Sequence, residues 1–198
     1  PRFYDVTEGE ILLDGVNIKD IKLHDLREKI GYVPQKGILF TGTIESNIRY
    51  GRNASASDKD ILKVIEIAQA KEFVDEKEQG ILSEISQGGT NVSGGQRQRL
   101  AIARALANKP EVLIFDDSFS ALDFKTDAAL RKAIGKEIKD RTVLIVAQRI
   151  STIMNAENIV VLDEGSIVGI GNHKELLKSC DVYSQIALSQ LSEEELAI

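Results

Sequence analysis

The sequence predicts an α/β domain built around a parallel sheet, and three observations support this fold class. Strand-like and helical segments alternate along the chain. Two short apolar runs, 112–115 and 143–147, are typical of strands that are buried on both faces of a parallel sheet. The length of 198 residues suits one domain with a sizeable core.

Turn and capping signals set the order of the elements. Asp14-Gly15 and Asp163-Glu164-Gly165 each separate two apolar runs, which predicts two hairpins. Ser57 with Asp60 forms a capping box that begins a helix. In chain order we expect strands at 11–13 and 16–18, a helix at 23–30, an extended segment at 31–34, helical turns at 43–50, a helix from 57 to about 74, a loop at 75–92, a helix at 93–107, a strand at 112–115, a helix at 125–139, a strand at 143–147, strands at 159–162 and 166–170, and helices at 172–179 and 181–191.

Composition excludes several classes of function. The net charge of −6 comes from interleaved acids and bases, and the absence of a basic stripe argues against nucleic-acid binding. The single Cys180 excludes an internal disulfide and fits a reducing compartment. His24 and His173 have no matching ligand cluster, so both are expected at the surface. The apolar runs are too short to span a bilayer, so any membrane attachment must come from other sequence.

The strongest functional signal is the run Ser93-Gly94-Gly95-Gln96, which opens an amphipathic helix. A small hydroxyl and two glycines leave backbone N–H groups unobstructed at the positive end of the helix dipole, which favours binding of an anion such as a phosphate. An ordinary glycine-rich loop capped by Ser93 is the alternative. The sequence QRQR, the helix behind it and the following VLIFDD strand favour the phosphate site.

Polar residues at strand ends are further candidates. Asp116 and Asp117 follow the apolar run VLIF, and Gln148 follows TVLIVA. The carboxyl ends of parallel strands border the crevice where α/β proteins bind ligands. The alternatives are a helix cap for Asp116 and a strand cap for Gln148.

These motifs, SGGQRQRLAIARAL and VLIFDD, resemble the signature motif and the Walker B strand of ABC-type ATPases, and the chain is most similar to the nucleotide-binding domain of ABC exporters. The resemblance covers nearly the whole chain. It implies a P-loop NTPase-like ABC ATPase fold, with a parallel core sheet and a helical signature subdomain at about 43–107. The Walker B and D-loop segment would be 112–123, the switch residue 148, and the C-terminal hairpin and helices 157–198.

The phosphate loop of this family, G-x-x-x-x-G-K-[ST], does not occur in the sequence. Gly135-Lys136 is followed by Glu137 and lies in a helical pattern. In the family, a segment like residues 1–15 follows the phosphate loop and its helix directly. We therefore expect a domain truncated at its N-terminus, whose parent protein has the loop and the adenine-stacking aromatic residue. Since the strand before that loop is normally central, we expect the isolated chain to be poorly stable and to bind ATP weakly.

The resemblance implies ATP and Mg²⁺ as cofactors and assigns the site residues. Asp116 would hold Mg²⁺ through water, and the Q-loop residue Gln35 would reach the metal shell. Ser93, Gly94, Gly95 and Gln96 would hold the γ-phosphate of a partner's ATP. Asp123, in the D-loop 120–123, would lie at the dimer interface.

Two departures from the family fall next to the chemistry. Asp117 stands where fully active sites carry Glu to polarise the attacking water, and its carboxylate is withdrawn by roughly an ångström, which can cost about 10²-fold in rate. Gln148 stands where the family usually has His, and an amide cannot become cationic. The pair predicts a degenerate catalytic site, as in one half of heterodimeric exporters. Alternatively, the backbone shifts and Asp117 still serves as the base.

The same resemblance predicts the partners. They are a second nucleotide-binding domain from a different chain and transmembrane helices at the cytoplasmic face of the plasma (inner) membrane, without direct contact to the exported drug, lipid or peptide. Ile38, Leu39 and Phe40 would dock a coupling helix, unless they are simply buried. In the X-loop position, 83–89, Ser86 and Gln87 depart from the family pattern. Arg97, Arg99 and Arg104 are expected in surface or interface ion pairs.

Four other functions stay open. A soluble ABC ATPase of DNA repair would carry a long coiled coil between the Q-loop and the signature, whereas only about sixty residues without heptads separate them here. A translation type would carry two such domains in one chain. A regulatory module would bind nucleotide without hydrolysis, and an importer subunit is a nearer relative that the run GTIESNIRYG disfavours.

Overall fold

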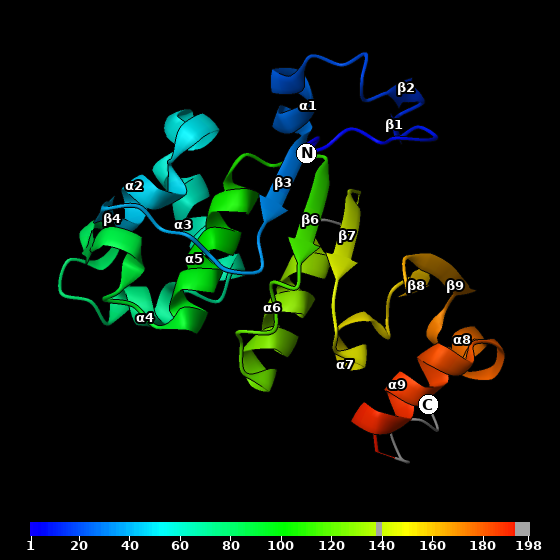
Figure 1. Ribbon diagram of the computed structural model, residues 1–198. Helices are drawn as coiled ribbons and strands as arrows, with labels where there is room; N and C mark the ends of the chain where they lie inside the picture. Colours follow the sequence, from blue (N-terminus) through cyan, green and yellow to red (C-terminus); the bar gives the residue numbers. More distant parts are fainter. Residues whose placement is uncertain (138–139, 193–198) are drawn as a thin grey trace. The chain divides into compact units, whose positions relative to one another are not determined.

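The computed structural model describes residues 1–137 and 140–192, and the chain divides into two compact units, Pro1–Val146 and Ala147–Ile198 (Figure 1). The first unit holds β1 (Leu12–Leu13), β2 (Val16–Asn17), α1 (Leu23–Lys29), β3 (Ile30–Val33), β4 (Gly42–Thr43), α2 (Ile44–Ile48), η1 (Gly51–Ser55), α3 (Asp58–Ile67), α4 (Lys71–Asp75), η2 (Gly80–Leu82), β5 (Glu84–Ile85), η3 (Gln87–Gly89), α5 (Gly94–Ala107), β6 (Val112–Asp116), α6 (Phe124–Glu137) and β7 (Thr142–Val146). The second unit holds α7 (Ile150–Ile153), β8 (Ile159–Asp163), β9 (Ser166–Gly171), α8 (His173–Ser179) and α9 (Asp181–Gln190).

The predicted parallel sheet is present in the first unit, with the strand order β3-β6-β7. β6 is the central strand and pairs with β3 from Ile30↔Val112 and with β7 from Val112↔Thr142. Leu113 and Phe115 on β6 are fully buried, as the apolar run predicts. Because all three strands run the same way, their carboxyl ends meet at one edge of the sheet.

The prediction that the strand over 143–147 is buried on both faces is wrong. Leu144 and Val146 on β7 are 54% and 50% exposed, and Val143 is 37% exposed. Within the part of the chain that the structure describes, β7 pairs with β6 alone and is an edge strand of this sheet. An edge strand with few neighbours keeps its apolar side chains in contact with solvent.

A helical region covers residues 43–107 and packs on α5, which contacts both α2 and α3 (Figure 1). The helix predicted from 57 to about 74 is broken, so that α3 ends after Ile67 and α4 begins at Lys71. Gln69 takes a φ of +55°, and the N–H of Ala70 donates to the carbonyl of Ile65 at 2.9 Å, which is a Schellman end. Ala68 and Ala70 are fully buried there, so core packing overrides their helix propensity.

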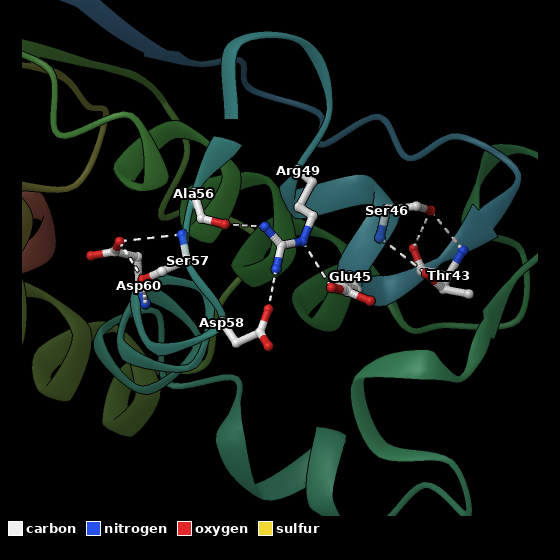
Figure 2. Close-up of polar contacts among 8 residues, drawn as sticks. All are labelled: Thr43, Glu45, Ser46, Arg49, Ala56, Ser57, Asp58 and Asp60. Atoms are coloured by element: carbon white, nitrogen blue, oxygen red, sulfur yellow. Dashed lines mark hydrogen bonds and ion pairs between the residues drawn. The ribbon is translucent and has the colours of Figure 1, made fainter. Parts of the chain in front are cut away.

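The N-termini of α2 and α3 are capped by their own sequence (Figure 2). Ser57 and Asp60 form the predicted capping box on α3, and the pKa of Asp60 falls to about 2 because Lys109 and Ser57 hydrogen-bond its carboxylate. Arg49 joins the two helices, because its guanidinium bonds Glu45 on α2, the carbonyl of Ala56, and Asp58 at the start of α3 (Figure 2). Arg49 therefore ties the end of α2 to the start of α3 across the turn between them.

The remaining local predictions are largely confirmed. The β1–β2 hairpin turns at Asp14-Gly15, and α1 follows it. The segment 75–92, predicted as a loop, also contains β5, which pairs antiparallel with β4. The helix predicted over 125–139 is α6, and its last two predicted residues lie outside the described part of the chain.

The second unit has a small core of its own, formed by Ile159, Val161, Leu176 and Tyr183 among others. The prediction that His173 lies at the surface is wrong: its ring is 7% exposed and its Nδ1 lies 2.7 Å from the Tyr183 hydroxyl. Burial lowers the pKa of His173, which favours the neutral ring. His24 is exposed, as predicted. None of the described helices combines the length and apolar character that a bilayer crossing requires.

Candidate functional site

The carboxyl edge of β3 and β6 brings three of the predicted residues together. Gln35 follows β3, and its Nε2 donates to Asp117 Oδ2 at 3.0 Å. Asp116 ends β6 and accepts a hydrogen bond from the Tyr32 hydroxyl on Oδ2 at 2.9 Å. Burial and this bond raise the pKa of Tyr32. We call Gln35, Asp116 and Asp117 the acidic edge.

The turn after β6 is anchored on both sides. Asp117 has a φ of +44°, a left-handed conformation in which Asp and Asn are enriched among residues other than Gly. Its N–H donates to the carbonyl of Val146 on β7 at 2.9 Å. The fully buried Ser118 donates its hydroxyl to the carbonyl of Val33 on β3 at 2.8 Å. The position of the Asp117 carboxylate is therefore set by both strands that flank β6.

Asp123 lies further along the same segment and caps α6. Its Oδ1 accepts a hydrogen bond from the Thr126 N–H at 2.9 Å. This backbone donor lowers the pKa of the Asp123 carboxyl, which is exposed. The Ser120 hydroxyl, three residues before Asp123, donates to the carbonyl of Asp117 at 2.8 Å.

The N-terminus of α5 carries the four residues that the sequence singled out. Ser93 Oγ accepts from the Gln96 N–H at 3.2 Å, and Gln96 Oε1 accepts from the Ser93 N–H at 3.0 Å, which completes a capping box. Ser93 and Gly94 are exposed. A Cβ placed on Gly94 would meet nothing within 4 Å, and one on Gly95 would lie 3.4 Å from the carbonyl of Ala121. We call Ser93–Gln96 the signature tip.

The tip and the acidic edge are separate features. Within residues 1–137 and 140–192, no hydrogen bond links Ser93, Gly94 or Gly95 to the acidic edge. The close approach of Gly95 to the carbonyl of Ala121 places the tip beside the segment 120–123.

Gln148 belongs to the second unit, where it is exposed and its carbonyl accepts a hydrogen bond from Gln190 Nε2 at 2.9 Å. Its expected role next to the acidic edge stays a prediction.

Comparison with known proteins identifies the family. A family model described as "ABC transporter" matches residues 2–120. The chain belongs to the ABC transporter family. An ATP-dependent lipid A-core flippase of Haemophilus influenzae is 47% identical over 191 residues, which are 96% of this chain and 32% of that protein. An uncharacterized ABC transporter ATP-binding protein of Mycobacterium bovis is 42% identical over the same length and coverage.

The structure of a bacterial Atm1-family ABC exporter with ATP bound superposes with a TM-score of 0.92 at 38% identity, over 97% of this chain and 34% of that one. The chain thus spans about a third of the length of the relatives it matches. The fold is that of an ABC ATPase, and the chain is an exporter-type nucleotide-binding domain.

In this ABC domain the three arginines of the signature helix α5 bond backbone carbonyls rather than acids among the described residues, and ion pairs across an interface stay a prediction. Arg97 donates to the carbonyl of Gly88 at 3.0 Å, Arg104 to the carbonyl of Ile38 at 2.9 Å, and Arg99 to the carbonyl of Gln69. Arg99 also lies over the Phe73 ring at 4.8 Å. Burial lowers the pKa of Arg99 and Arg104. The partners of the three arginines are backbone carbonyls of neighbouring segments. Every residue has a carbonyl, so the sequence could not indicate these partners.

The loop after Gln35 is only partly exposed. Leu39 is buried at 2% exposure, contrary to the docking role predicted for it, while Ile38 and Phe40 are 59% and 42% exposed. The ring of Phe40 stacks on Tyr50 with 4.2 Å between the ring centroids. Ile38, Phe40 and Tyr50 are exposed apolar side chains of the first unit, and we call these three residues the aromatic surface.

The side chains of the acidic edge have the chemistry that Mg²⁺ requires of its ligands. A carboxylate and an amide oxygen are ligand types that Mg²⁺ prefers, and Asp116 and Gln35 supply them at one edge. The Tyr32 hydroxyl already holds one oxygen of Asp116, so the carboxylate is orientated before any metal arrives. Tyr32 was not among the predicted site residues, although its place three residues before Gln35 in a parallel strand is a signal for it.

Proposed function

We propose that this chain is the ATP-binding domain of one half of a heterodimeric ABC exporter, and that it completes its partner's catalytic site while turning over its own ATP slowly. The observation that carries the proposal is the signature tip, which is capped by its own residues and still exposed. A helix N-terminus that is closed by its own capping box needs no further contact within the chain. Its remaining hydrogen-bonding capacity is available to a ligand from outside.

The partner's site would use the signature tip. The backbone N–H groups of Gly94 and Gly95 and the hydroxyl of Ser93 would hold the γ-phosphate of ATP that is bound mainly by the second domain. The positive end of the α5 dipole favours that negative charge. The open space beside Gly94, where a side chain would meet nothing of this chain, leaves room for the phosphate to approach the backbone.

The chain's own site would use the acidic edge. Asp116 and Gln35 would hold Mg²⁺, which when bound neutralises charge on the phosphates. Asp117 would orient the attacking water, with Gln148 as its predicted neighbour. Since the Asp117 side chain is one methylene shorter than the family's glutamate, and since its backbone is anchored to Val146, its carboxylate reaches less far toward the water.

The transmembrane part would dock on the aromatic surface. Ile38, Phe40 and Tyr50 offer a helix from the membrane domain an apolar contact at the cytoplasmic face, next to the loop that carries Gln35. Binding and hydrolysis of ATP would then alternate the transmembrane helices. One relative is named as a lipid A-core flippase, and we propose a lipid, drug or peptide as the cargo.

Turnover of the assembled heterodimer tests the proposal. Ser93→Arg in this chain should nearly abolish ATP hydrolysis, because the longer cation occupies the place of the phosphate, and ATP should still bind to both domains. Turnover at the wild-type rate in Ser93→Arg would contradict a role for the tip. An assembled wild-type complex that binds ATP without hydrolysing it would instead support a regulatory module.

A further inference from the structure

Gln98 is a buried polar residue of α5 that the proposed function has not used. Its side chain is 1% exposed and lies on the helix that begins at the signature tip. Its Nε2 donates to the carbonyl of Pro34 at 3.0 Å, and its Oε1 accepts from the N–H of Gly37 at 2.8 Å. Figure 1 shows the segment after β3 passing across α5. One amide therefore bonds two backbone groups that lie more than sixty residues earlier in the chain.

The two backbone groups lie on either side of Gln35. Pro34 precedes it directly and Gly37 follows two residues later, so the amide of Gln98 holds the short segment that presents Gln35 to Asp117. Arg104 extends the attachment by donating to the carbonyl of Ile38 at 2.9 Å. The loop is thus fastened to α5 on both sides of its functional residue.

Gly37 shows how closely the loop approaches the helix. A Cβ at this position would lie 3.0 Å from the carbonyl of Arg97 and from Gln98 Oε1, and 3.2 Å from the Cβ of Ala101. These distances are shorter than ordinary contacts, and two of the three atoms belong to rigid parts of the helix. Only a residue without a side chain allows the Gly37 N–H to reach the amide of Gln98 without displacing the loop.

We infer that Gln98 is a positioning residue that sets Gln35 over Asp117 and makes the loop and the signature tip move as one body. The chain of contacts runs from Asp117 to Gln35, through Pro34 and Gly37 to Gln98, and along α5 to Ser93. The catalytic consequence rests on the proposed function. The structural consequence, that the loop is held to α5 by this amide, does not.

The chemistry of the amide explains why glutamine suits this place. It carries one acceptor and one donor at the ends of a side chain of the required length. Glutamate keeps the acceptor for Gly37 and loses the donor for Pro34, and leucine loses both. In either variant a partly buried backbone group loses its partner, which is unfavourable.

Hydrogen exchange on the assembled transporter tests the attachment directly. In Gln98→Leu, the amide of Gly37 should exchange about tenfold faster or more, while the interior amides of α5 at 100–102 keep their protection. Gln98→Glu should leave the Gly37 amide protected, since the acceptor remains. Gly37→Ala should loosen the same segment with Gln98 intact, and Gln79→Glu, at an exposed position of the same unit, is the charge-matched control.

Steady-state turnover of the same variants tests the positioning role. Both Gln98→Leu and Gly37→Ala should lower kcat by about tenfold and change the KM for Mg-ATP by less than about twofold, because they disturb the orientation of Gln35 without removing any group that binds Mg-ATP. We expect this fall in kcat whether the chain's own site or the partner's site hydrolyses ATP. Gln98 bonds the loop that carries Gln35 in the chain's own site, and it lies on the helix α5 that carries the signature tip for the partner's site.

The outcomes separate the two proposals. Wild-type protection of Gly37 in Gln98→Leu, or wild-type kcat in both Gln98→Leu and Gly37→Ala, would overturn the inference. If Gln98→Leu does not fold, Gly37→Ala decides, and wild-type protection of residue 37 together with wild-type kcat in that variant would overturn the inference. A complex that hydrolyses no ATP at all, but in which Gln98→Leu exposes the Gly37 amide, would refute the proposed function and leave the attachment of the loop confirmed.

Discussion

The signature tip and the acidic edge are built in opposite ways. The tip consists of four consecutive residues whose capping box is closed by Ser93 and Gln96 alone, and its outer side is exposed. The edge collects Gln35 and the acids 116 and 117 from two strands, and its side chains bond one another and Tyr32. The hydrogen bonds of the tip leave its outward backbone N–H groups unused by its own side chains. At the edge, the groups that would bind a ligand are hydrogen-bonded to one another and to Tyr32.

This difference predicts how each region responds to a ligand. A phosphate at the tip meets donors that are already in place and breaks no hydrogen bond of the capping box. A metal at the edge competes with the bonds from Tyr32 to Asp116 and from Gln35 to Asp117. We therefore expect turnover to depend more steeply on changes at the tip than on changes at the edge.

The largest expected effect is that of Gly94→Asp. A side chain fits there within this chain, since a Cβ would meet nothing, but a carboxylate would repel a phosphate and fill its place. We expect ATP turnover of the heterodimer to fall by about 10²-fold or more, as when a donor to a developing anion is removed. Gly135→Asp, at an exposed helical glycine with equally open surroundings, is the matched control and should leave turnover unchanged.

Asp117→Asn should have a much smaller effect. Asparagine tolerates the left-handed backbone of this residue as well as aspartate does, so the variant removes the charge and keeps the turn. If this half contributes little to hydrolysis, turnover of the heterodimer should change by less than about threefold. A loss as severe as that of Gly94→Asp would refute the degenerate site and make the two regions equal partners in catalysis.

Tyr32→Phe tests whether the hydrogen bond from Tyr32 to Asp116 stabilises the acidic edge. The variant removes one hydrogen bond to a carboxylate at a partly buried site and keeps the ring that packs edge-to-face on Phe3. We expect a loss of about 1 kcal/mol in the free energy of unfolding by urea titration. Tyr4→Phe, at a residue that is 91% exposed, is the control, and equal losses in both variants would contradict a stabilising bond to Asp116.

The smallest expected effect is the pH dependence of the cap at Asp123. Because the folded state lowers the pKa of this carboxyl from its ordinary 3.8, its contribution to stability is present above that value and is lost as the pH falls through the lowered one. Asp123→Ala should therefore melt slightly below the wild type at pH 7, and the difference in Tm should vanish in strong acid. Asp123→Asn keeps an acceptor that does not titrate, so the difference in Tm between this variant and Asp123→Ala should not vanish in strong acid.

The parts of the fold that the sequence predicted are those determined by neighbouring residues. The capping boxes at Ser57 and Ser93, the hairpin at Asp14-Gly15 and the apolar strand that ends at Asp116 depend on residues a few positions apart. Gln35 and the acids were brought together because the carboxyl ends of parallel strands share one edge.

The missed features depend on contacts between distant segments. Gln98 reads as one more polar residue of the signature helix, because its partners are backbone groups that every sequence has. His173 gave no sign that its ring would be enclosed beside Tyr183. The exposure of β7 followed from its place at the rim of the sheet, which an apolar run does not reveal.

The left-handed turn at Asp117 has a consequence for any attempt to speed up this half. Replacing Asp117 by Glu would lengthen the acid toward the water, yet the longer side chain must adopt a backbone conformation that costs ordinary residues about 1 kcal/mol or more. At this one position, the longer reach of the carboxylate would then be offset by the higher free energy of the backbone conformation. A fast version of this domain is best sought by exchanging the whole turn at 117–120 together with the acid, so that geometry and chemistry change in step.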